Sequence, residues 1–307
     1  MEILFLGTGA GVPSKSRNVS SLVLKLLNEL NETWLFDCGE GTQHQILKTT
    51  LKPGKVKNIF ITHMHGDHIF GLPGFLSSRS FQGGDNQPIT IYGPPGIEQY
   101  INASLKYSKS NLLYKVNIVE LDPKGGELQL NKGWKVKYLP LQHNVLSFGY
   151  RIEEPKSDGV LLVEKLKEYN IPNGPIFGKL KNGETVTLED GTELDGKDFV
   201  GEAQPGKVIA IIGDTRPNAN IGKLAEEADV LVHEGTHAKG ENKMANRYFH
   251  STVEQAAQVA KQSKVKQLYL NHISSRYLGA DVKQLEKDAR SIFKQTKVAY
   301  DLNEFEI

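Results

Sequence analysis

The sequence of 307 residues is short of several features, and each shortage excludes a class of protein. Cys38 is the only cysteine, so the chain has no internal disulfide and no zinc finger built on cysteine ligands. No apolar run approaches the roughly 20 residues that cross a bilayer. The N-terminus, MEILFLGTGA, lacks a cationic start and has too short an apolar core for a signal peptide. We therefore expect a cytoplasmic protein, without membrane association, whose metal ligands are nitrogen and oxygen atoms.

Net charge is also small, +1 at pH 7, and by itself favours no partner. It conceals an uneven distribution. Residues 153–204 hold six lysines, no arginine and twelve acids, a net −6, whereas the rest of the chain has 31 basic and 24 acidic residues, a net +7. This segment is rich in glycine and proline and poor in apolar periodicity. Two interpretations stay open: a solvated surface excursion, or an arm that presents its locally basic stretch GPIFGKLKNG to a partner.

Short apolar, β-branched runs recur along the rest of the chain and predict strands. They lie at 2–7, 33–37, 56–63, 88–93, 134–141, 207–214, 229–234 and 265–272. Helical patterns lie between some of them, at 41–50, 96–108 and 251–263. In the last of these patterns, Ser251 and Glu254 have the spacing of a capping box. Strands that alternate with helices predict an α/β or layered architecture.

Histidine is concentrated at one place, in the stretch ITHMHGDH. His63, His65, Asp67 and His68 fall within six positions, directly after an apolar run. In an extended chain His63 and His65 lie on one side and can converge on one cation. Gly66 permits a sharp turn, so that Asp67 and His68 can face a second cation. Zn²⁺ accepts such nitrogen and oxygen ligands. No packing or capping rule calls for this string, so it predicts a metal site.

Three more candidate ligands, His143, Asp214 and His272, follow apolar runs elsewhere in the chain. Strand ends are where the sites of α/β sheets are assembled, and the two oxygens of Asp214 can bridge two cations. Taken alone, each has an ordinary interpretation, as a satisfied polar residue for the histidines and as a turn or N-cap residue for Asp214. The histidine string makes all three stronger candidates.

Two cations held in this way predict a particular chemistry. A pair about 3.5–4 Å apart lowers the pKa of a bridging water toward ~7 and stabilises charge on a phosphoryl oxygen. Asp67 is a candidate to hold that water and accept its proton. The sequence therefore predicts metal-assisted hydrolysis without a covalent intermediate.

The string THMHGDH resembles the signature of the metallo-β-lactamase superfamily, and further segments resemble its ribonuclease Z (tRNase Z) branch. These segments are FLGTGAGVPSKSRN, LFDCGEGTQHQ, GPIFGKLKNGETV, HEGT, HST and AYDLNEF, which together span nearly the whole chain. The sequence is thus identified as a member of that family, in its short form. The resemblance implies an αββα four-layer sandwich, in which residues 1–152 and 205–307 form one catalytic domain and residues 153–204 form an inserted flexible arm.

The resemblance also implies a function. It is that of a zinc-dependent endoribonuclease that removes the 3′ trailer from precursor tRNA and leaves a 3′-hydroxyl on the tRNA and a 5′-phosphate on the trailer. Two Zn²⁺ per subunit of a homodimer are implied. The implied ligands are His63, His65 and His143 for one ion, Asp67, His68 and His272 for the other, and Asp214 as the bridge.

Catalytic roles follow from the same resemblance. Asp67 is implied as the proton acceptor. His250, helped by Glu234, is implied near the scissile phosphate, where it stabilises or protonates the leaving 3′-oxygen. Because His250 directly precedes the predicted capping box, it should lie at a helix N-terminus, where phosphate oxygens are favoured. The family usually has alanine where Gly235 stands.

Candidate RNA contacts lie in two places. Lys15 and Arg17, in the N-terminal loop, are candidates for phosphate contacts, although a solvated basic loop is the simpler interpretation. The resemblance implies that the arm grips the tRNA elbow, a folded shape of the kind that proteins recognise in double-stranded RNA. The candidate residues there are Gly174, Pro175, Lys179 and Lys181.

Two alternatives differ in class from this function. One is another hydrolase of the superfamily, a phosphodiesterase or a small-molecule hydrolase, which would share the histidine string; the arm and the HST and HEGT segments argue against it. The other is a catalytically inactive RNA-binding or scaffold protein. Such a protein should have lost ligands, yet all seven candidates are present.

Overall fold

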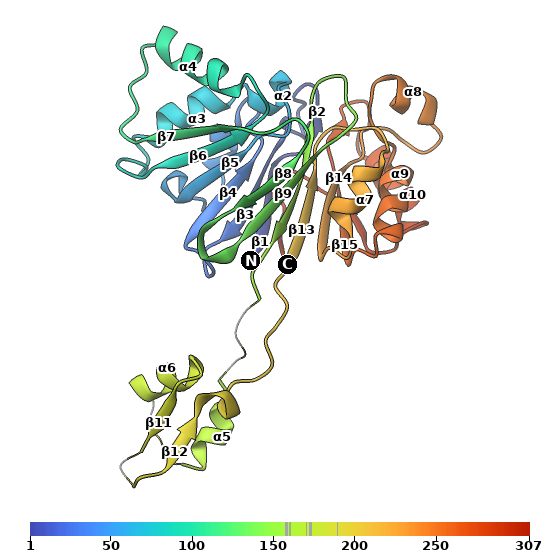
Figure 1. The fold of residues 1–307 in the computed structure, drawn as a ribbon. Helices are drawn as coiled ribbons and strands as arrows, with labels where there is room; N and C mark the ends of the chain where they lie inside the picture. The colour runs from blue at the N-terminus through green and yellow to red at the C-terminus, as the bar shows by residue number, and fades with distance from the viewer. Residues whose placement is uncertain (157–158, 160, 170, 172–173, 189) are drawn as a thin grey trace. The chain divides into compact units, whose positions relative to one another are not determined.

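The computed structural model describes residues 1–307 except 157–158, 160, 170, 172–173 and 189. The chain forms two compact units (Figure 1). The larger comprises Met1–Ile152 and Val208–Ile307, and the smaller comprises Glu153–Lys207. Among the described residues, none of the helices has both the length and the apolar character needed to span a bilayer.

Two seven-stranded sheets form the larger unit, and the first has the order β18-β1-β3-β4-β5-β6-β7. Its strands are β1 (Glu2–Gly7), β3 (Ser21–Leu26), β4 (Glu32–Phe36), β5 (Val56–Phe60), β6 (Ile89–Gly93), β7 (Val116–Glu120) and β18 (Glu304–Glu306). The strands from β18 to β4 pair antiparallel, and those from β4 to β7 pair parallel.

The second sheet has the order β17-β15-β14-β13-β10-β9-β8. Its strands are β8 (Gly126–Gln129), β9 (Lys135–Pro140), β10 (Phe148–Glu153), β13 (Val208–Ile212), β14 (Val230–Glu234), β15 (Gln267–Asn271) and β17 (Thr296–Val298). β13, β14, β15 and β17 pair parallel. A short parallel ladder joins β2 (Gly9–Ala10) to β16 (Ile273–Ser274) and brings the N-terminal loop beside the segment that follows β15.

The apolar residues of the larger unit form three layers. Between the sheets, Trp34 and Trp134 meet edge to face with ring centroids 5.5 Å apart. The outer face of each sheet, for example Leu35 of the first and Leu231 of the second, packs in a further apolar cluster. Because both faces of the central strands are buried, β1, β13 and β14 are nearly continuous apolar runs, whereas β8 and β9 alternate between buried or half-buried and exposed residues. This is the αββα arrangement.

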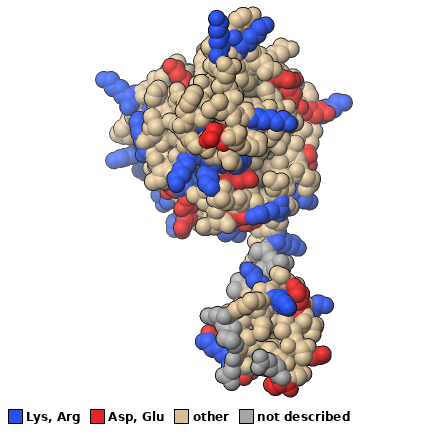
Figure 2. Space-filling view, turned by 90° about the vertical axis from the view of Figure 1, so that its left-hand side faces the viewer, with Lys and Arg blue, Asp and Glu red and all other residues tan. Residues whose placement is uncertain are grey.

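Helices form the two outer layers of the sandwich. The helices of the first layer are α1 (Thr42–Ile46), α2 (Gly66–Ile69), α3 (Leu72–Arg79) and α4 (Ile97–Tyr107). Those of the second layer are α7 (Ala219–Ala225), α9 (Val253–Gln262) and α10 (Ala280–Arg290), and α8 (Asn242–Arg247) lies between β14 and α9 along the chain. On the face of the larger unit shown in Figure 2, lysine and arginine side chains are spread among acidic ones.

All eight predicted strands and all three predicted helices are present, but their ends matter for the site. β5 ends at Phe60 and β13 at Ile212, so His63, His65 and Asp214 lie in loops after their strands, whereas Asp67 and His68 lie in the short helix α2. The predicted capping box was one residue out of register. Thr252 is the N-cap of α9, and its partner is Gln255.

The smaller unit has a small core of its own, which the weak periodicity of its sequence did not predict. Leu166, Leu180, Leu194 and Phe199 form a buried cluster. They come from short, separate elements, so no repeating pattern is visible along the chain. The elements are α5 (Val163–Lys167), α6 (Pro175–Lys181), β11 (Thr185–Thr187), β12 (Glu193–Asp195) and a 3₁₀ turn (Gly196–Phe199).

Candidate metal centre

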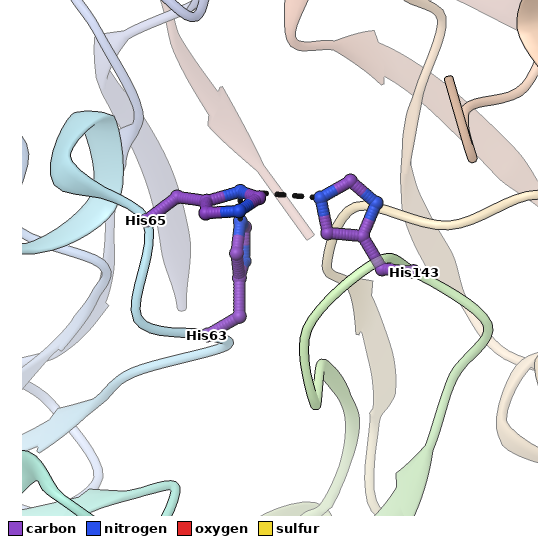
Figure 3. Close-up of side chains that lie close together, drawn as sticks. All are labelled: His63, His65 and His143. Carbon is purple, nitrogen blue, oxygen red and sulfur yellow. Dashed lines mark hydrogen bonds between the residues drawn. The ribbon is translucent and has the colours of Figure 1, made fainter.

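Three imidazoles from two loops converge at one point of the larger unit (Figure 3). His63 and His65 come from the loop after β5, and His143 comes from the connection between β9 and β10. The Nδ1 atom of His65 lies 3.1 Å from Nε2 of His63 and 3.2 Å from Nε2 of His143. Three nitrogens this close together can hold one cation.

A second set of ligand atoms lies beside the first. Nε2 of His68 and Nε2 of His272 each lie 3.4 Å from Oδ2 of Asp67. Oδ2 of Asp214 lies between the two sets, 3.7 Å from Nε2 of His63, 3.5 Å from that of His68 and 3.2 Å from that of His272. The structure therefore brings all seven predicted ligands together, with the Asp214 carboxylate between the two groups.

Hydrogen bonds to Nδ1 orient four of the five histidines so that Nε2 faces the cluster. In each of these four histidines, Nδ1 lies close to an oxygen that can accept a hydrogen bond from it. These oxygens are Oγ1 of Thr62 for His63 (2.9 Å), Oδ2 of Asp37 for His68 (2.7 Å), the Phe249 carbonyl for His143 (3.0 Å) and Oγ1 of Thr236 for His272 (2.9 Å). Partners of this kind fix the tautomer of metal-binding histidines.

His68 provides the clearest test of whether the site fits a metal. Its Nε2 is buried and has no hydrogen-bond partner among the described residues, and such buried orphan atoms are rare. Burial alone would lower the pKa of His68, but Asp214 and Asp37 raise this pKa well above its usual value. The surroundings of His68 therefore favour positive charge, which a cation bound to Nε2 would supply in place of a proton.

The ionisation of the other ligands also fits a cation. Burial lowers the pKa of His63, His65 and His143, which favours the neutral imidazole that metals bind. For Asp67 and Asp214, burial would raise the pKa, but the neighbouring His272 and His68 lower it below the usual range. Both carboxyl groups are therefore ionised, and neutral imidazoles with carboxylates form a donor set suited to Zn²⁺.

Asp37 supports this centre and was not predicted from the sequence. Besides facing His68, its carboxylate accepts the backbone N–H of Thr62 at 2.8 Å and the Thr62 hydroxyl at 2.9 Å. Its φ is +56°, a conformation that aspartate adopts more readily than most residues. The signal was available, because Asp37 directly follows an apolar run, as Asp214 nearly does.

Glu234 and His250 form a pair at the edge of the candidate metal ligands. Glu234, the last residue of β14, is buried and accepts N–H groups from Thr215 at 2.8 Å and Ser251 at 3.1 Å. Nδ1 of His250 lies 3.0 Å from Oε1 of Glu234 and 4.0 Å from Oδ2 of Asp214. Burial alone would lower the pKa of His250, but the Glu234 carboxylate raises it to about 9. His250 thus carries its proton at neutral pH, with Nε2 left for a substrate atom.

The segment that holds His250 begins with a strained residue. Phe249 has φ +58°, which is unfavourable for a bulky side chain. Its carbonyl is the acceptor for His143, and the Arg216 guanidinium lies over its ring, 4.6 Å from the centroid. Phe249 therefore links the candidate ligand His143 to His250, its own neighbour in the chain.

The two candidate RNA contacts of the N-terminal loop differ. Lys15 is exposed. Arg17 is only 4% exposed, and its NH1 donates to the Thr8 hydroxyl at 2.5 Å and to the Ala299 carbonyl at 2.7 Å. The phosphate contact predicted for Arg17 is therefore wrong, because the guanidinium is buried. Instead, Arg17 ties the N-terminal loop to the C-terminal segment.

The remaining candidates belong to the smaller unit. Gly174 is the N-cap of α6, Pro175 is its first residue, and Lys179 and Lys181 lie in its last turn. All four are exposed. Most of the basic stretch thus forms a short helix, and Leu180 anchors this helix in the small core.

Comparisons with known proteins agree with this geometry. The family model described as "Anti-Pycsar protein Apyc1" matches residues 1–158. A ribonuclease Z of Ligilactobacillus salivarius is 59% identical over 100% of this chain and 97% of its own length, and one of Lactobacillus johnsonii is 59% identical over 100% and 99%. The crystal structure of human tRNase Z, short form, is 30% identical with a TM-score of 0.71, covering 100% of this chain and 99% of that one.

The two sheets between helical layers, with histidines and carboxylates gathered beyond the strand ends, define a protein of the metallo-β-lactamase fold. YhfI of Bacillus subtilis, a metallo-β-lactamase fold protein, shares this fold at 16% identity with a TM-score of 0.68, covering 100% of this chain and 98% of its own. The full-length matches are more specific. The chain belongs to the ribonuclease Z family and, over residues 1–158, to the family of the Apyc1 model.

Proposed function

We propose that this chain is an endoribonuclease that removes the 3′ trailer from precursor tRNA, leaving a 3′-hydroxyl on the tRNA and a 5′-phosphate on the trailer. The observation that carries the proposal is the convergence of seven nitrogen and oxygen ligands in one cluster. That cluster lies in a chain that matches proteins named ribonuclease Z over its whole length.

The proposed cofactors are two Zn²⁺. His63, His65 and His143 would hold one, Asp67, His68 and His272 the other, and Asp214 would bridge them. Bound there, the ions supply a water of lowered pKa and positive charge opposite the phosphoryl oxygens. The chain itself contributes neutral imidazoles, two ionised carboxylates and the hydrogen bonds that orient them.

Asp67 is the proposed proton acceptor for the attacking water. Its Oδ2 accepts the backbone N–H of Gly11 at 2.9 Å and faces His68 and His272. The N-terminal loop therefore fixes the carboxylate in place, so that it can hold the water and take its proton. Arg17 is buried and anchors this loop, so the contribution of Arg17 to the reaction is structural.

His250 is the proposed proton donor to the leaving 3′-oxygen. The donation would come from Nε2, because Nδ1 is engaged with Glu234. Glu234 would orient the ring and keep it protonated, since its carboxylate raises the pKa of His250 to about 9. In this arrangement, a buried carboxylate orients the general acid and keeps it protonated.

The smaller unit is proposed as the part that binds tRNA away from the cleaved bond. Exposed Lys179 and Lys181 lie on one helical turn of an otherwise acidic segment, where they would contact phosphates. The net +7 of the rest of the chain suits a polyanion, so binding should weaken with salt. Lys15 is a further candidate contact. A homodimer and a cytoplasmic location stay predictions; light scattering of the purified protein would test the first.

The decisive experiment is cleavage of a trailer-bearing precursor tRNA by the purified protein. Mapping the new ends should give a mature 3′-hydroxyl and a 5′-phosphorylated trailer, and a chelator should abolish the reaction until Zn²⁺ is restored. Metal analysis should give about two ions per chain. An enzyme that hydrolyses small phosphodiesters but leaves the precursor intact would contradict the proposal and favour another hydrolase of the superfamily.

A further inference from the structure

A cavity of about 380 Å³ opens beside the metal ligands, within the size range of small-molecule sites. Its lining includes the proposed ligands His65 and Asp67, the acid Glu40, and the apolar residues Val12, Pro13 and Phe70. Together these residues make an apolar wall next to a charged centre. That combination fits a flat apolar group attached to a phosphate.

Phe70 is the feature of this cavity that folding does not explain. Its side chain is 64% exposed although it is a large aromatic residue. The ring lies against Gly66, where an added Cβ would come within 2.2 Å of a ring carbon. Gly66 stands between His65 and Asp67 in the chain, so the ring is held beside the proposed ligands. Val12, which also lines the cavity, is 59% exposed, so both apolar side chains present surface that a ligand can cover.

We infer that this cavity stacks one nucleobase of the RNA substrate, that of the first trailer nucleotide, on the ring of Phe70. The inference rests on the proposed function. Unpaired RNA bases commonly stack on aromatic side chains. Such stacking tolerates any base, because every base has a π-face.

The choice of nucleotide follows from the position of His250. If His250 protonates the leaving 3′-oxygen, the last nucleotide of the tRNA departs on the His250 side. The residues that line the cavity include Asp67, the proposed proton acceptor, and do not include His250 or Glu234. The nucleoside that stays on the phosphorus is the first of the trailer, and it occupies the cavity on the Asp67 side.

A double-mutant cycle between protein and RNA tests this assignment. The variants are Phe70→Ala, Phe70→Tyr and the matched control Phe81→Ala, since Phe81 is 79% exposed and does not line the cavity. The substrates are precursor tRNAs with a normal first trailer nucleotide, with an abasic one there, and with an abasic last tRNA nucleotide. Metal content of each variant is measured in parallel.

We expect Phe70→Ala to lower kcat/KM on the normal precursor about tenfold, within the range that alanine substitution of a base-stacking aromatic produces. On the abasic-trailer substrate the loss should shrink to about twofold, because no stack remains to be lost. Phe70→Tyr should restore the rate, Phe81→Ala should match the unsubstituted enzyme, and all variants should retain their metal.

Equal losses on the normal and abasic-trailer substrates would overturn the inference, as would a loss of metal with Phe70→Ala. Coupling to the last tRNA nucleotide instead would overturn the trailer assignment. Failure of the unsubstituted enzyme to cut any precursor would contradict the proposed function itself. A different result, in which the unsubstituted enzyme and the Phe70→Ala enzyme cut the normal precursor at the same rate, would overturn only the stacking site.

Discussion

Each of the two units has its own apolar core, and the two cores differ greatly in size. The larger has three extensive apolar clusters around two seven-stranded sheets. Among its described residues, the smaller has one cluster of four buried apolar residues and a two-stranded ladder. A rigid scaffold is what a metal centre needs, because its ligands must be held to fractions of an ångström. A surface that contacts a folded RNA needs less, so damage to the two units should have different kinetic signatures.

The largest effect should come from the centre of the larger unit. Asp214→Ala removes the carboxylate that lies between both ligand sets. We expect kcat/KM to fall at least about 1,000-fold, since bound ions contribute several kcal/mol to the transition state and about 1.4 kcal/mol is tenfold. Precursor tRNA and a small phosphodiester should be affected alike, with less metal bound. Asp281→Ala, at an exposed position of α10, is the control. An Asp214→Ala enzyme that kept both its metal and its rate would contradict the bridging role.

His250→Ala should come next, with a loss of about 100- to 1,000-fold in kcat, within the range for a lost general acid. Metal content should stay normal, because His250 is not among the proposed ligands. Glu234→Gln should lower kcat less. The amide oxygen can still accept the hydrogen bond from Nδ1 of His250, but the negative charge that keeps His250 protonated is gone. The sharpest readout is a precursor with a sulfur-substituted leaving group, which needs no protonation. If His250→Ala slowed that substrate as much as the normal one, the residue would not be the acid.

Deleting 156–200 removes most of the smaller unit and separates the roles of the two units. Precursor tRNA cleavage should fall at least about 100-fold, equivalent to about 2.8 kcal/mol of binding. Hydrolysis of a small phosphodiester should persist, because every proposed ligand lies in the larger unit. The control is the double variant Lys179→Gln and Lys181→Gln, which should lose less precursor tRNA cleavage than the deletion. Its loss should appear in KM alone and should become smaller at high salt. Equal loss of both activities on deletion would mean that the segment supports the fold of the larger unit.

Much of the larger unit was predictable from the sequence, for physical reasons. Strands buried on both faces give continuous apolar runs, and the string from His63 to His68 has no packing explanation. The ends of elements were less predictable, as the shifted cap at Thr252 shows. The supporting residues were missed or misjudged because their roles depend on partners far along the chain. Asp37 faces His68, and Arg17 contacts the Ala299 carbonyl. The core of the smaller unit was invisible for a related reason, since no single element contributes a periodic face.

The smallest expected effect tests whether that small core matters. Leu180→Ala deletes a fully buried side chain, at a cost of about 2–5 kcal/mol. A core this small rarely supplies more than about 3–5 kcal/mol, so the smaller unit should lose much of its order while the larger does not. KM for precursor tRNA should rise by up to about tenfold, or about 1.4 kcal/mol of binding, with kcat and small-phosphodiester hydrolysis unchanged. Val163→Ala, at a site 40% exposed in the same unit, should have little effect. Hydrogen exchange would locate the change, and faster exchange confined to residues 153–207 is expected. Exchange that quickened throughout the sheets would show that the two units unfold together, and the contrast between a rigid scaffold and a weakly held arm would then fail.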